Sequence, residues 1–171
     1  MYNKNLKIVL AVISVAIAIW QFIGNYIGNG ILLLLLAGIF IFLYFKNEII
    51  LLAFFKLKKQ DLEGTNQLLD KIKSPETALV TKQQGYFNYL KGIILSQTNI
   101  TQAEKHLKKA LKLGLNMDQD VAVAKLNLAG IAMTKRRKRE AQLLLNEAKK
   151  LDTHGMLKDQ LTMMKQQLKR I

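Results

Sequence analysis

Residues 90–113, LKGIILSQTNITQAEKHLKKALKL, and residues 128–151, LAGIAMTKRRKREAQLLLNEAKKL, are the two stretches that decide the fold. Small residues and leucines recur between them at a single spacing of 38 residues. The matched positions are Leu90, Gly92, Ala103, Leu107, Ala110 and Leu113 in the first stretch, and Leu128, Gly130, Ala141, Leu145, Ala148 and Leu151 in the second. A period of about 20 to 50 residues is typical of stacked helical repeats. The sequence therefore predicts an all-α solenoid.

Each stretch has the pattern of two helices joined by a turn. In the first unit, residues 84–97 and 101–113 are expected to be helical, with Thr101 as the N-cap and Glu104 completing a capping box. The second helix carries Ala, Leu and Ala at i, i+4 and i+7, which places them on one face. Short alanine side chains let two helices approach closely. We therefore expect compact helical hairpins with these residues inside.

This pattern resembles the tetratricopeptide repeat (TPR), a family of helix-turn-helix modules that bind proteins. The family's order of aromatic, Leu, small residue, Ala, Leu and Ala falls on Phe87, Leu90, Lys91, Ala103, Leu107 and Ala110, and again on Lys125, Leu128, Ala129, Ala141, Leu145 and Ala148. Lys91 and Lys125 depart from the usual residue types, and the family's period is about 34. The resemblance implies a TPR-like solenoid over 46–155, with units at about 46–78, 84–117 and 122–155. A C-terminal capping helix is expected over 156–171.

In this family the first helix of each unit lines a concave groove that holds a partner. The resemblance therefore implies a partner-binding groove built from Asn88, Gly92, Leu95, Leu126, Gly130 and Met133. Apolar neighbours suit a partner helix, and glycine would admit a partner backbone closely. The alternative is that both glycines serve only close packing between repeats, since a glycine inside a helix costs about 1 kcal/mol and needs some reason.

The first 45 residues are of a different kind. Between Lys7 and Lys46 there is no charged side chain. Residues 6–23 and 31–45 are two apolar segments, and the glycine- and asparagine-rich residues 24–30 predict a turn between them. The first is about long enough to cross a bilayer as a helix, and the second reaches that length when it is counted from Ile27. We therefore expect a two-helix transmembrane anchor over 1–45. A cleaved signal peptide is the competing interpretation, because Ala16-Ile17-Ala18 has the small-x-small form, but apolar residues continue beyond it.

The cations predict the orientation of this anchor. Lys4 and Lys7 lie at the start of the first segment, Lys46 follows the second, and the turn between them has no cation. Basic flanks stay in the cytoplasm. The sequence therefore predicts a protein integral to the inner membrane of a bacterial-type cell, with two spans and both termini in the cytoplasm.

The residues that would carry chemistry are few. The chain has no Cys, which excludes disulfides, thiol nucleophiles and Cys-ligated zinc. His106 is expected on a solvent-facing helix position and His154 in a loop, without metal-ligand spacing. Asp118 and Asp120 are closer to a helix-capping pair than to a calcium site. We therefore expect no enzyme, no metal, no cofactor and no small-molecule substrate.

A second candidate binding feature is a run of five cations, Lys135, Arg136, Arg137, Lys138 and Arg139, at the turn of the last hairpin. The chain carries a formal charge of +14. A cytoplasmic leaflet is negative, so this run could bind anionic lipid or an acidic partner. A solvated turn is the plain alternative. Nucleic acid also fits the charge, but the aromatic residues for base stacking are missing.

Three functions follow from these features. The first is a membrane-anchored scaffold or adaptor that binds protein partners of a membrane complex through its groove. The second is an integral accessory subunit of a transport or secretion complex, held mainly through its transmembrane hairpin. The third is a membrane-tethered nucleic-acid binder that uses the basic turn.

Overall fold

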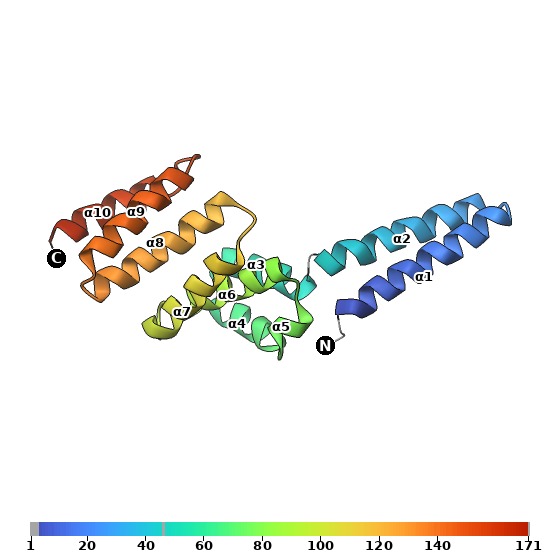
Figure 1. The fold of residues 1–171 in the computed structure, drawn as a ribbon, viewed down its shortest axis with the longest axis horizontal. Helices are drawn as coiled ribbons and strands as arrows, with labels where there is room; N and C mark the ends of the chain where they lie inside the picture. The colour runs from blue at the N-terminus through green and yellow to red at the C-terminus, as the bar shows by residue number, and fades with distance from the viewer. Residues whose placement is uncertain (1–3, 46, 171) are drawn as a thin grey trace. The chain divides into compact units, whose positions relative to one another are not determined.

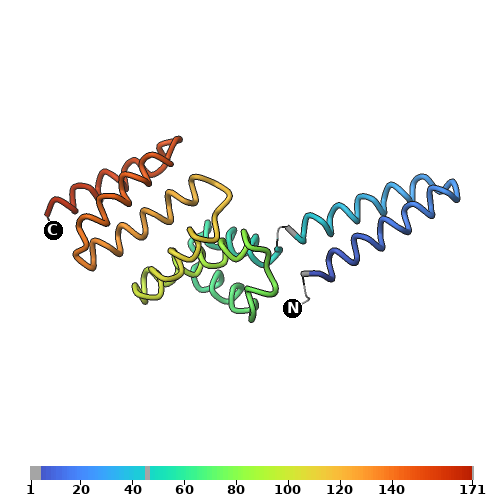
Figure 2. The backbone as a smooth tube through the Cα atoms, viewed as in Figure 1, coloured from blue at the N-terminus to red at the C-terminus, as the bar shows by residue number. Residues whose placement is uncertain are grey.

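The computed structural model describes residues 4–45 and 47–170, and these form ten helices and no strand (Figures 1 and 2). The predicted all-α fold class is confirmed at this level. The chain divides into two compact units, residues 1–83 and 84–171. Each unit is a succession of helical hairpins.

The first unit begins with two long apolar helices, α1 (Lys4–Ile23) and α2 (Ile27–Phe45), which lie antiparallel side by side (Figure 1). Both are long and apolar enough to cross a membrane. Their contact is made by small residues, Ala11, Ser14 and Ala18 from α1 and Gly30 and Ala37 from α2, all of them buried. Small residues allow the close approach that helices need inside lipid.

The large apolar side chains of this hairpin point outward. Trp20 is 76% exposed, Ile23 78% and Leu35 66%. A soluble core helix would bury such residues. The turn between the helices ends α1 with Asn25 in the left-handed region, at φ 61°, where Asn is among the few side chains tolerated.

A shorter hairpin follows in the same unit, made of α3 (Glu48–Lys58) and α4 (Leu62–Asp70), with a single helical turn, α5 (Pro75–Ala78), after it. Asn47 caps α3 by accepting a hydrogen bond from the backbone N–H of Ile49, and Asp61 caps α4 in the same way through Gly64. The predicted flanking cation Lys46 lies outside the described residues.

The second unit contains the first of the two matched stretches as α6 (Thr81–Leu95), which begins at the end of the first unit, and α7 (Ile100–Leu113). Ala103, Leu107 and Ala110 have no exposed surface, as the repeat pattern predicts. Gly85 is required here, because a Cβ at this position would lie 2.5 Å from the Gly114 carbonyl oxygen.

The cap of α7 differs from the prediction. Asn99, not Thr101, is the N-cap, and its side chain accepts a hydrogen bond from the backbone N–H of Gln102 at 3.1 Å. The helix begins one residue earlier than expected, so Thr101 is already inside it. Glu104 therefore does not complete a capping box and is free to bind cations instead.

The second matched stretch forms α8 (Asp118–Thr134) and α9 (Lys138–Leu151), followed by α10 (Lys158–Lys169). The extra residues that lengthen the repeat spacing lie at the start of α8, where Asp118 and Asp120 are in the first turn. The Asp120 carboxylate accepts a hydrogen bond from the Tyr86 hydroxyl at 2.8 Å. A helix is present at the C-terminus as expected, with Leu157, Leu161 and Leu168 buried in the core of α8 and α9.

Candidate partner-binding groove

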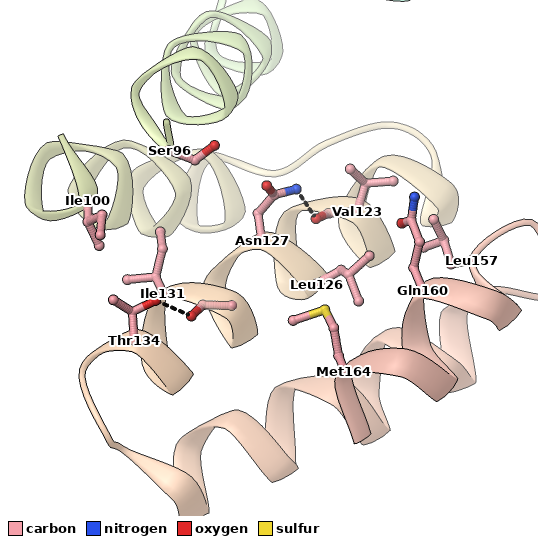
Figure 3. A pocket seen from close by; sticks show the side chains of 11 residues that line it. Ser96, Ile100, Val123, Leu126, Asn127, Ile131, Thr134, Leu157, Gln160 and Met164 are labelled. Atoms are coloured by element: carbon pink, nitrogen blue, oxygen red, sulfur yellow. Dashed lines mark hydrogen bonds between the residues drawn. The ribbon is translucent and has the colours of Figure 1, made fainter. Parts of the chain in front are cut away.

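A hollow of about 520 Å³ lies in the second unit, along one face of α8 (Figure 3). Helix α8 contributes its floor, the turn region between α6 and α7 forms one side, and α10 forms the other. The lining residues are Ser96, Ile100, Val123, Leu126, Asn127, Gly130, Ile131, Thr134, Leu157, Gln160 and Met164. We call this hollow the α8 groove.

The α8 groove exists because one stripe of α8 is made of small or neutral residues. Val123, Asn127, Gly130 and Thr134 follow one another at intervals of three and four residues, so they lie on one face of the helix. A Cβ at Gly130 would meet only the Met164 methyl carbon, at 3.5 Å. The groove is thus open at Gly130 because no large side chain fills it.

The polar groups of the α8 groove are neutral and mostly satisfied by their own helix. The Asn127 amide donates to the Val123 carbonyl oxygen at 2.9 Å, and the Thr134 hydroxyl donates to the Gly130 carbonyl oxygen at 3.1 Å (Figure 3). None of the described residues that line this hollow has an ionisable side chain. Such a surface suits apolar side chains with a few hydrogen bonds, not acid–base chemistry.

A second hollow of about 560 Å³ continues from the first, and the two share Gly130, Thr134 and Met164. Met133, Gln167 and Arg170 complete its lining. Arg170 gives this end of the groove a positive charge. Together the two hollows run along α8 and α10 as one channel with an apolar middle and a basic end.

The structure brings together three of the residues predicted for the groove. Leu126 and Gly130 line the α8 groove, and Met133 lines its continuation. Leu126 and Met133 are themselves buried, so the atoms they offer lie at the bottom. Gly130 and the flexible thioether of Met164 are the accessible centre.

The three groove residues predicted on α6 have other surroundings. Asn88 is buried between α6 and α7, where its side chain lies 2.9 Å from the His106 Nδ1. Gly92 is buried against α7, because a Cβ there would lie 2.6 Å from the Leu107 Cγ. Leu95 is half-buried and is not among the residues that line either hollow. For Gly92, packing within the hairpin explains the glycine.

The structure also corrects the prediction for His106. It was expected to face solvent, but it is half-buried and bonded to Asn88. Burial lowers the pKa of His106, and the nearby cations Lys91, Lys105 and Lys109 lower it further. Both effects favour the neutral imidazole, which bridges the two helices of the hairpin.

The basic run divides into two groups. Lys135 and Arg137 bind Glu104 of α7, at 2.7 Å and 2.9 Å, and Lys108 binds the same carboxylate at 2.7 Å. Hydrogen bonds from Arg137, Lys108 and Lys135 hold the pKa of Glu104 well below its ordinary value. This cluster, which we call the Glu104 network, joins the first hairpin of the unit to the turn of the second.

The remaining cations of the run are exposed. Arg136 lies in the turn, while Lys138 and Arg139 lie in the first turn of α9. Arg136 has a φ of 57°, in the left-handed position that ends a helix and usually holds glycine. A non-glycine residue there costs about 1 kcal/mol. Its side chain points into solvent without an offsetting contact among the described residues, which makes it a candidate for binding.

Ser96, Ile100, Asn127 and Gln160 were missed as groove residues. Asn127 could have been found, because a neutral amide one turn from Gly130 on the same helix marks a face that is not packed. Ser96 and Ile100 could not, since they reach the groove only through the way the first hairpin stacks on the second. Within residues 4–45 and 47–170, no three His, Asp or Glu side chains gather where they could hold a metal ion.

Comparison with known proteins supplies no relative: the chain matches no family model, no curated protein and no solved structure.

Proposed function

We propose that the protein is a membrane-anchored scaffold or adaptor of the TPR type, which holds a protein partner at the cytoplasmic face of a bacterial-type inner membrane. Helices α1 and α2 would be the anchor, and the α8 groove would be the contact for the partner. The α8 groove is the single observation that carries the proposal, because it is a channel whose centre is kept open by a glycine.

Membrane anchoring is supported by the distribution of apolar surface in the first hairpin. Large side chains such as Trp20 and Leu35 point outward, while small ones such as Ala18 and Ala37 make the helix–helix contact. This inside-out arrangement is expected in lipid, where large apolar residues need not be buried in protein. Lys7 at one end and the cation-free turn at the other favour termini in the cytoplasm.

Partner binding is supported by the chemistry of the groove. Its middle is apolar and neutral, with Gly130 and Met164 at the surface, and methionine adapts its shape to different partners. The basic end at Arg170 and the exposed cations Arg136, Lys138 and Arg139 suit a partner that carries acidic residues beside its apolar ones. Anchoring raises the local concentration of even a weakly bound partner.

The test is to crosslink intact membranes, extract the protein in mild detergent and compare what co-purifies with wild type, Gly130→Ala and Gly130→Leu. Alanine adds only a Cβ in ordinary contact with Met164, whereas leucine fills the centre of the groove. We expect partners to be kept with alanine and lost with leucine, while circular dichroism shows the same helix content for all three. The same partners with Gly130→Leu would refute the groove, and would favour an accessory subunit held through its transmembrane hairpin.

A further inference from the structure

Helix α3 carries an apolar stripe that is largely exposed. Leu51, Leu52 and Phe55 are 41%, 53% and 55% exposed. Their spacing of one, three and four residues puts them on one side of the helix. The other side is packed, since Ile50 and Ala53 are buried against α4. The exposed stripe is thus a separate surface and not part of the core.

The start of this stripe lies at the level where the two apolar helices end. The Lys7 Nζ is 3.3 Å from the carbonyl oxygen of Leu43 in α2 and 2.5 Å from the Glu48 carboxylate of α3. The first turn of α1, the last turn of α2 and the first turn of α3 therefore meet at one ion pair. If α1 and α2 span a bilayer, this meeting point marks its surface, and α3 starts there.

Lysines bound the stripe at the C-terminal end of the helix. Lys58 and Lys59 are exposed at the C-terminal end of α3, and Lys58 lies over the Phe54 ring, 5.4 Å from its centroid. The only acidic residue of the helix, Glu48, is neutralised by Lys7. An apolar stripe bounded by lysines is the pattern of a helix that lies in a membrane surface. A protein partner could cover the stripe only with an apolar face of its own. Lipid is favoured as the cover, because the stripe begins next to the two apolar helices.

We propose that α3 lies in the membrane surface, with Leu51, Leu52 and Phe55 at the boundary between headgroups and acyl chains and with Lys58 and Lys59 at anionic headgroups. The partner of this surface is phospholipid with a negative headgroup. The inference rests on the proposed anchoring of α1 and α2 and adds a third membrane contact. It would restrict how far the repeats can move from the bilayer.

The absence of cysteine makes a direct test possible, because a single introduced cysteine carries a spin label at one known site. The full chain would be reconstituted in vesicles of equal parts phosphatidylcholine and phosphatidylglycerol. The labelled variants would be Leu52→Cys and Phe55→Cys on the stripe, Ile39→Cys on the outside of α2, and Gln67→Cys on the exposed side of α4. Accessibility to oxygen and to a water-soluble nickel chelate gives the depth of each label.

We expect Ile39 to be deepest, Gln67 to be in water, and both stripe positions to lie about 5–10 Å below the headgroups. Stripe labels as accessible to nickel as Gln67, with Ile39 in lipid, would overturn the inference while leaving the anchor in place. An Ile39 label in water would refute the anchor itself. In phosphatidylcholine alone, the Leu52 label should become several-fold more accessible to nickel, and unchanged accessibility would overturn the role of anionic headgroups.

Discussion

Gly92 and Gly130 occupy equivalent places in the two matched stretches, yet the structure predicts opposite effects for replacing them with alanine. Alanine is favoured over glycine inside a helix by about 1 kcal/mol, because glycine loses more backbone freedom on folding. At Gly130 this gain is unopposed, since the new Cβ would lie 3.5 Å from the flexible end of Met164. We therefore expect Gly130→Ala to raise the free energy of unfolding by about 0.5–1 kcal/mol.

At Gly92 the same Cβ would lie 2.6 Å from the Leu107 Cγ and 3.2 Å from the Leu107 backbone nitrogen. Leu107 has no exposed surface, so it cannot turn away into solvent. Overpacking of this kind costs about 1–3 kcal/mol. After the gain in helix propensity, Gly92→Ala should lower the free energy of unfolding by up to about 2 kcal/mol, so that the two variants differ by about 1–3 kcal/mol.

Thermal unfolding of the full chain in mild detergent, followed by circular dichroism, measures this difference. About 1 kcal/mol corresponds to about 4–8 °C for a unit of this size. We expect a higher Tm than wild type for Gly130→Ala and a lower one for Gly92→Ala. Equal shifts of the same sign would refute the assignment of one glycine to hairpin packing and the other to an open groove.

Three further predictions concern the turns and ion pairs. Glu104→Gln should lower the free energy of unfolding by about 1–3 kcal/mol, because charge-assisted hydrogen bonds are lost. Glu147→Gln breaks an exposed ion pair and should lower it by less than about 1 kcal/mol. Urea unfolding at several pH values measures both effects. Folding lowers the pKa of Glu104, so its contribution is complete above about pH 4.5 and is lost as the pH falls below that, and Glu104→Gln should remove this dependence. Asn99→Ala should cost about 1 kcal/mol and Thr101→Ala much less, since only Asn99 caps α7, and equal losses in thermal unfolding would contradict the cap assignment. Arg136→Gly should stabilise the fold by about 1 kcal/mol, because glycine adopts the left-handed conformation without strain, and a Tm at or below that of wild type would contradict this assignment.

The sequence pattern predicted the inside of the hairpins well. Ala103 and Leu107, with their counterparts Ala141 and Leu145, have no exposed surface. Such positions are predictable because alanines and leucines at i, i+4 and i+7 lie on one face of a helix, and this face packs closely against the preceding helix. The two apolar helices before Lys46 were equally predictable, because their length and their lack of charged residues can be read directly from the sequence.

The groove was predicted only in part, because repeat positions do not fix how a helix is rotated. Four residues separate α6 from α7, and three separate α8 from α9. One residue changes the direction of a side chain by about 100° around a helix. In α6 the residue that faces the next helix is Gly92, whereas in α8 Ala129 is buried there, and Gly130 is turned towards Met164 of α10. The position of α10 depends on tertiary packing, which the repeat pattern does not contain.

The measurement that tests the central claim most directly is site-specific photocrosslinking in cells. A photoreactive amino acid would replace Gln160, which lines the α8 groove, or Asn146, which is exposed on α9 and lines neither hollow. We predict a protein adduct from position 160, none from position 146, and loss of the adduct when Gly130→Leu is added. The same adduct from both positions, or an adduct that survives Gly130→Leu, would contradict the proposal that the α8 groove holds the partner.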